Sequence, residues 1–82
     1  MTRDEARKII SDEDLTDFNW FNEHEMSPDE VGIIYESDVC YVYSTDERAN
    51  PVTKKSFQSE SEALENFIKR LRALNKFNRL YK

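Results

Sequence analysis

Apolar residues recur at steps of three and four between residues 59 and 79, a spacing that places them on one face of an α-helix. Ser59 opens this segment and Glu62 follows three residues later, which predicts a capped first turn. Acidic residues lead and basic residues follow, the order that the helix dipole favours. We expect residues 78–82 to fray. The predicted apolar stripe consists of Leu64, Phe67, Ile68, Leu71 and Leu74.

The first residues repeat this pattern on a smaller scale. Thr2 and Glu5 have the spacing of a second capping pair. Apolar residues at positions 6, 9 and 10 then predict a short helix over residues 3–12. The acidic run at residues 12–14 opposes the dipole at a helix C-terminus, so we expect the helix to end there.

The middle of the chain has the composition of β-strands. Residues 31–36 and 39–45 are rich in β-branched and aromatic side chains and are separated only by Ser37 and Asp38, which predicts a central β-hairpin. The glycine within the first strand, Gly32, predicts a β-bulge. A short edge strand is predicted over residues 52–57, where two adjacent lysines are a common guard against edge-to-edge pairing.

Residues 18–24 are compatible with two structures. Phe18 and Trp20 alternate as on a strand, whereas Phe21 points to the opposite face and favours a one-turn helix. We favour a strand that forms a hairpin with residues 31–36, because a Ser-Pro-Asp turn signal lies between them. Trp20 is then either a core anchor or a binding hot spot.

These elements predict an α+β fold with the order α-β-β-β-β-α. A small antiparallel sheet would carry the short N-terminal helix and the long C-terminal helix on one face. The 82 residues suffice for one domain, residues 1–82, whose small core also makes a homodimer a live alternative.

Residue types that support catalysis are scarce. His24 is the only histidine and Cys40 the only cysteine, so the chain cannot assemble a zinc site or an internal disulfide. We expect His24 to be a solvated loop residue and Cys40 an inert core residue. With Gly32 as the only glycine, no phosphate-binding loop or dinucleotide fingerprint can be written. The sequence therefore predicts a protein that is not an enzyme and holds no metal or cofactor.

The net charge of −5 is unevenly distributed. Residues 1–50 carry 14 acidic and four basic side chains, whereas residues 51–82 carry three acidic and eight basic ones. An acidic front half argues against a nucleic-acid binder, whose phosphate contacts need a basic face, and suits a basic protein partner. The sequence contains no leader pattern and no apolar run long enough to cross a membrane, so we expect a cytoplasmic protein.

Two stretches of the sequence carry a family resemblance, together with the pair Trp20 and Phe21. One covers residues 43–49 (YSTDERA) and the other residues 57–68 (FQSESEALENFI). They resemble the small immunity proteins of bacterial polymorphic-toxin systems, most closely the group called immunity protein 59. The resemblance implies a cytoplasmic protein, encoded beside a toxin, that binds the toxin domain and neutralises it.

The candidate binding residues are charged side chains of the loops. Asp46, Glu47 and Arg48 follow a central strand, where binding loops commonly lie, although an internal arginine–carboxylate pair would equally explain them. If the toxin were a nuclease, an acidic patch could fill its basic cleft and speed association. The predicted partner-binding set is Glu23, Glu25, Asp29, Glu30, Asp46, Glu47 and Arg48.

Two other functions are compatible with the sequence. One is a non-catalytic adaptor that forms homodimers through its sheet edge. The other is a regulator whose basic last helix contacts nucleic acid, although the helix dipole and solvation explain those basic residues equally well. The favoured prediction is a cognate toxin as partner, with no nucleic acid and no membrane, and a monomer or weak homodimer.

Overall fold

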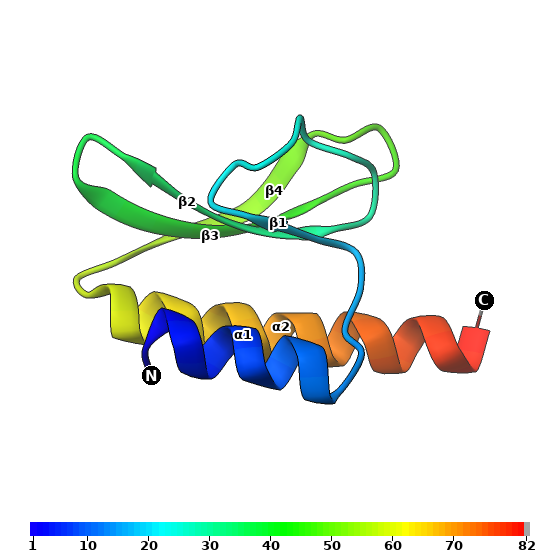
Figure 1. Cartoon of the computed structure of the whole chain (residues 1–82). Coiled ribbons are helices and arrows are strands. Elements are labelled where there is room, and N and C mark those ends of the chain that lie inside the picture. Colours follow the sequence, from blue (N-terminus) through cyan, green and yellow to red (C-terminus); the bar gives the residue numbers. More distant parts are fainter. Residues whose placement is uncertain (82) are drawn as a thin grey trace.

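The computed structural model describes residues 1–81. Four strands form one sheet in the order β1-β2-β3-β4. Both helices lie against the same face of this sheet (Figure 1). The α+β class, the order of elements and the placement of the helices are therefore as predicted. The elements are α1 (Arg3–Asp12), β1 (Phe18–Trp20), β2 (Val31–Glu36), β3 (Val39–Thr45), β4 (Pro51–Phe57) and α2 (Glu60–Tyr81).

Both helices begin at the predicted caps. In α1 the Glu5 amide donates to the Thr2 hydroxyl and the Thr2 amide donates to the Glu5 carboxylate, at 3.2 and 2.9 Å. In α2 the Glu62 amide donates to the Ser59 hydroxyl at 3.2 Å. The expected fraying is wrong for residues 78–81, because the helix continues to Tyr81; Lys82 lies outside the described residues.

The central hairpin has the predicted bounds. β2 and β3 pair antiparallel, from Val31 opposite Ser44 to Glu36 opposite Val39. Ser37 and Asp38 both adopt positive φ, 50° and 64°, as a two-residue turn requires when it follows the right-handed twist of its strands.

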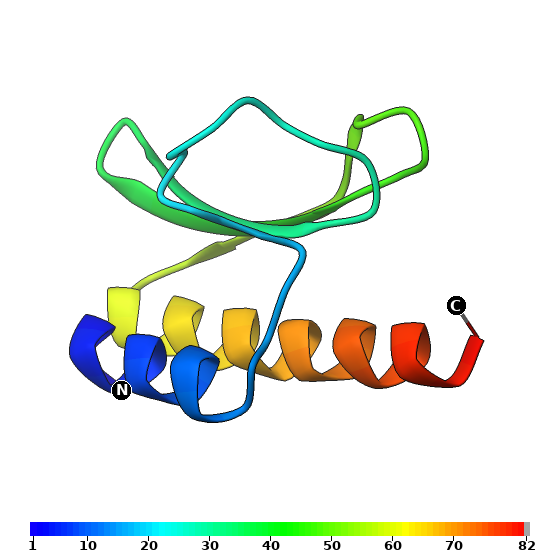
Figure 2. The same cartoon turned by 45° about the vertical axis from the view of Figure 1, so that its right-hand side comes forward.

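The first strand differs from the hairpin predicted for residues 18–24 and 31–36. β1 covers only Phe18–Trp20 and pairs with β2 in parallel, so the expected hairpin between them is wrong and the sheet is mixed. Residues 21–30 explain the difference. This loop turns away at Phe21 and Asn22, both with positive φ, and arches over the face opposite the helices before β2 begins (Figure 2).

The core fills the space between the sheet and the helices. Phe67 of α2 lies at its centre, with ring centroids 6.3 Å from Phe18 and 5.9 Å from Trp20. Trp20 is only 6% exposed, which identifies it as a core anchor. Cys40 is buried here as expected, and burial raises the pKa of its thiol.

Gly32 does not form the predicted bulge. It pairs in register with Tyr43, and the irregularity lies between Val42 and Ser44, opposite β4. A Cβ atom on Gly32 would lie 2.1 Å from Cζ of Tyr43, whose side chain is fully buried. Glycine is therefore needed here to admit the tyrosine ring on the outer face of the sheet.

Candidate functional site

Two loops meet at one end of the sheet, on its outer face. They are residues 21–30, between β1 and β2, and residues 46–50, between β3 and β4. The Asp29 amide donates to the Asp46 carbonyl at 3.1 Å, and the Thr45 amide donates to the Glu30 carbonyl at 2.8 Å. The structure thus brings the acidic segment at residues 29–30 beside the segment at residues 46–48, although they are far apart in sequence.

Glu30 lies inside this junction and is only 4% exposed. One carboxylate oxygen is 2.9 Å from Nε2 of His24, and the other accepts a hydrogen bond from the Ser27 amide at 3.0 Å. Its own amide donates to the Thr45 hydroxyl at 2.8 Å. Glu30 is therefore an internal anchor rather than a surface group, and His24 is its partner rather than a freely solvated residue.

The anchor belongs to a buried polar cluster that the sequence reasoning missed. Nδ2 of Asn19 donates to the His24 carbonyl at 2.9 Å, and the Thr45 hydroxyl donates to the Ser27 carbonyl at 2.7 Å. Tyr43 lies beneath the same loop, where burial and then the charge of Glu30 raise the pKa of its phenol. Strand alternation could have indicated the cluster, because positions 19, 43 and 45 share the outer face.

Asp46 fixes the second loop through the backbone. Its carboxylate accepts hydrogen bonds from the amides of Asn50 and Arg48, both at 2.9 Å. These bonds, that from Asn50 first, lower the pKa of the Asp46 carboxyl. Among residues 1–81, Arg48 takes part in no ion pair, so the arginine–carboxylate pair considered from the sequence does not form. Asp46 shapes the loop, and Glu47 and Arg48 remain exposed.

The other predicted residues lie on the surface of the first loop. Glu23, Glu25 and Asp29 are all exposed. Glu23 is 3.8 Å from Arg7, a loose contact between two solvated side chains. Within residues 1–81 neither Glu25 nor Asp29 forms an ion pair. Three exposed acidic groups without an ion-pair partner in the described part of the chain, Glu25, Asp29 and Glu47, thus lie on the loops that Glu30 and Asp46 hold in place.

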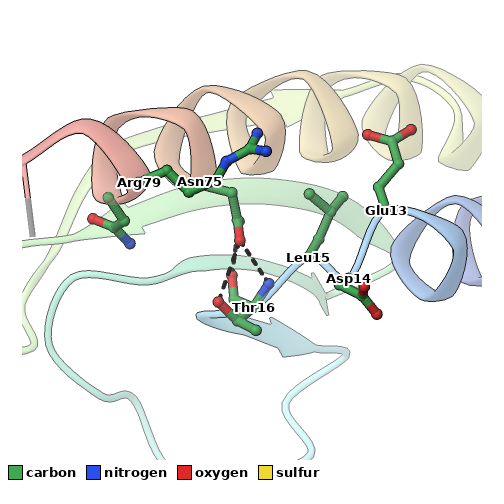
Figure 3. Close-up of a pocket in the computed structure, with 7 residues that line it drawn as sticks. Glu13, Asp14, Leu15, Thr16, Asn75 and Arg79 are labelled. Atoms are coloured by element: carbon green, nitrogen blue, oxygen red, sulfur yellow. Dashed lines mark hydrogen bonds between the residues drawn. The ribbon is translucent and has the colours of Figure 1, made fainter.

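A hollow of about 570 Å³ lies elsewhere, between α2 and the segment that joins α1 to β1. Figure 3 shows Asn75 pointing from α2 toward Thr16; its Oδ1 accepts from the Thr16 amide and hydroxyl at 2.9 and 3.2 Å. At the same boundary Arg72 donates two hydrogen bonds to Glu13, which lower the pKa of that carboxyl. These polar groups join two elements, so we interpret the hollow as a structural joint.

A second hollow, of about 520 Å³, lies beside the half of β2 that β1 leaves uncovered. Phe21 stacks on Tyr35 with centroids 6.0 Å apart, and the Arg3 guanidinium lies 3.9 Å from the centre of the Phe21 ring. Aromatic and arginine side chains of this kind are enriched in protein–protein interfaces. Its lining comprises Arg3, Phe21, Asn22, Met26, Ile34, Tyr35 and Glu36.

Within residues 1–81, no three histidine, cysteine, aspartate or glutamate side chains are grouped so that they could hold a metal ion. In the same part of the chain, neither helix has the length and apolar character needed to span a membrane. The arrangement offers exposed acidic groups on two hydrogen-bonded loops, beside an aromatic hollow.

The model of a known family, immunity protein 59, matches residues 4–82. The chain belongs to the immunity protein 59 family. This confirms the resemblance carried by residues 43–49 and 57–68. No curated protein and no solved structure matches the chain significantly.

The Glu30 anchor under the loop of residues 21–30 can be tested directly. Replacing Glu30 with alanine leaves the Ser27 amide and His24 without their buried partner, so we expect a loss of about 1–2 kcal/mol in the free energy of unfolding. Glu30→Gln keeps an acceptor for the amide and should lose less. Urea denaturation measures both losses, and amide exchange at residues 21–30 should accelerate in the alanine variant. Unchanged exchange would contradict the anchoring role.

Proposed function

We propose that this immunity protein binds a cognate toxin domain and neutralises it by covering its active or substrate-binding surface. Membership of the family supports the role. We choose this surface because the acidic groups of the two joined loops differ: some are hydrogen-bonded within the protein, and others are exposed without an ion-pair partner in the described chain. The carboxylates of Glu30 and Asp46 accept hydrogen bonds from backbone amides of their own loops. Glu25, Asp29 and Glu47, in contrast, are exposed and have no ion-pair partner among residues 1–81.

Charge complementarity would act on the rate of association. Exposed carboxylates in one region attract a basic surface at long range, and the attraction weakens with salt. A nuclease domain is the kind of toxin that fits best, because a cleft that binds phosphates must be basic. Glu23 would extend the acidic surface after releasing Arg7, and Arg48 would meet an acidic group at the rim of the toxin.

Rigidity would act on the strength of the complex. The loop of residues 46–50 is held by hydrogen bonds to the Asp46 carboxylate, and the Asp29 amide is bonded to the Asp46 carbonyl. Loops that are already ordered lose little conformational freedom when a partner binds. The aromatic hollow beside Phe21 and Tyr35 could then receive an apolar side chain of the toxin.

The proposal is tested by co-expressing the protein with the toxin domain encoded beside it, scored by growth rescue and co-purification. We expect rescue and a complex whose association slows as salt is raised. The double variant Asp29→Lys/Glu47→Lys should slow association by about tenfold or more at low salt.

The matched control is Asp4→Lys/Asp12→Lys, which changes the net charge equally on α1, a helix on the other side of the sheet. This control should keep rescue and the association rate. A complex insensitive to both salt and the loop reversals would contradict the acidic surface. Failure of rescue and of co-purification with a folded protein would contradict the immunity role and favour the adaptor function.

A further inference from the structure

The C-terminal end of α2 exposes large apolar side chains. Phe77, Leu80 and Tyr81 are 54%, 66% and 71% exposed, and the rings of Phe77 and Tyr81 lie 4.9 Å apart. The last turns of the helix project beyond α1 and the sheet in both views (Figures 1 and 2). Exposed apolar groups gathered at one place are typical of interaction sites.

These groups continue a row of exposed residues along the side of α2 that faces away from the sheet, which we call the outer ridge. Each member lies three or four residues from another member, so together they share one helix face. The acidic members lie in the first turns and the basic members follow, with one small residue, Ala73, between the lysines. The outer ridge consists of Glu62, Glu65, Lys69, Ala73, Lys76, Phe77 and Leu80, all exposed.

The charges of the outer ridge are not used within the protein. Among residues 1–81, none of its two glutamates and two lysines forms an ion pair. This includes Glu65 and Lys69, although a separation of four residues is favourable for such a pair. The other charged face of α2 differs, because Arg72 binds Glu13 and Glu60 binds Arg3.

We propose that two copies of this chain associate through their outer ridges, with the two α2 helices antiparallel. The polarity of the ridge makes it complementary to itself in this arrangement alone, because each acidic half meets a basic half. A two-fold axis between Lys69 and Ala73 places Glu65 of each copy beside Lys76 of the other. The small Ala73 leaves room for the aliphatic stem of the facing lysine, and Phe77 and Leu80 cover the first turns of the facing helix.

The sheet edge is less suited to this pairing. The exposed edge strand β4 carries Lys54 and Lys55, and Thr53 within it has a positive φ of 49°. Charged side chains and backbone irregularity both oppose the addition of another strand. The outer ridge also faces away from the loops at residues 21–30 and 46–50, so a dimer formed through it keeps both toxin-binding surfaces open.

Sedimentation velocity over a range of protein concentrations tests the proposal without any toxin. We expect the wild type to pass reversibly from monomer to dimer. Leu80→Glu places a charge on the exposed apolar end and should weaken dimerisation by at least about tenfold. Val52→Glu is the matched control, because Val52 is an exposed apolar residue on β4 and should have no effect if the outer ridge is the interface.

A charge exchange identifies the facing residues. Glu65→Lys and Lys76→Glu each place like charges together in a homodimer, so each variant alone should associate at least about tenfold more weakly than the wild type. Mixing the two variants restores both opposite-charge contacts and should restore dimers. Restoration on mixing also shows that neither variant has failed to fold.

Three results would overturn the proposal. One is a wild type that stays monomeric at every concentration. Another is dissociation by Val52→Glu but not by Leu80→Glu, which would assign the dimer to the sheet edge. The third is a mixture of the charge variants that stays monomeric. A monomeric wild type whose toxin capture is lost in Leu80→Glu would assign the outer ridge to the toxin instead.

Discussion

Replacing Phe67 with alanine is expected to lower the free energy of unfolding by about 3–5 kcal/mol. The Phe67 side chain is fully buried and touches Phe18 and Trp20 in edge-to-face geometry. Its removal leaves a cavity between α2 and the shortest strand of the sheet, where β1 is held on one side only by β2. A domain of this size has little stability in reserve, so a large part of the variant should be unfolded at room temperature.

Urea denaturation followed by tryptophan fluorescence measures this loss, because Trp20 lies directly against the altered site. The matched control is Leu80→Ala on the same helix, measured at concentrations that keep the protein monomeric. The Leu80 side chain is exposed, and its loss should change the stability by less than about 0.5 kcal/mol. A loss below about 1.5 kcal/mol for Phe67→Ala would show that the sheet and α2 collapse onto the space, contradicting its central place in the core.

Replacing Gly32 with valine is expected to lower the free energy of unfolding by about 3 kcal/mol. The added Cβ alone would lie 2.1–2.5 Å from three atoms of the Tyr43 side chain. The ring cannot move aside freely, because the Tyr43 side chain is fully buried. Either the strand pairing or the loop must therefore shift to admit the new methyl groups.

Denaturation of a double-mutant cycle measures the clash itself. Shortening Tyr43 to alanine removes the atoms that the valine meets, so Gly32→Val should cost much less in that background than in the wild type. Ile34→Val, on the same face of the same strand, is the matched control and should cost about 1 kcal/mol. Equal costs of Gly32→Val in both backgrounds would contradict the close approach of the tyrosine ring.

Phe67 and the Gly32–Tyr43 contact lie on opposite faces of the sheet. Phe67 secures the helices to one face of the sheet, and the Gly32–Tyr43 contact allows the loop of residues 21–30 to lie close over the other face. The proposed binding surface depends on the second layer, since the exposed carboxylates stand on loops that the buried polar cluster positions. The proposed dimer contact lies on the exposed side of α2, away from the loop of residues 21–30.

The local sequence determined the elements whose signals lie within a few residues. The Thr2–Glu5 pair and the apolar spacing of residues 59–79 predicted both helices, because capping and amphipathic periodicity act over one or two turns. The hairpin at residues 31–45 followed equally from β-branched strands and a two-residue turn. The segments at residues 43–49 and 57–68 likewise indicated the family that the comparison confirms.

Only the tertiary structure decided the features that depend on distant segments. The parallel pairing of β1 follows from the path of residues 21–30 over the sheet, which no local pattern encodes. Asp29 and Glu30 are adjacent acidic residues, yet one is exposed and the other buried, because Ser27, His24 and the β3 end supply partners to Glu30 alone. Burial depends on how the layers assemble. It therefore distinguishes the structural carboxylate of Glu30 from the exposed carboxylate of Asp29.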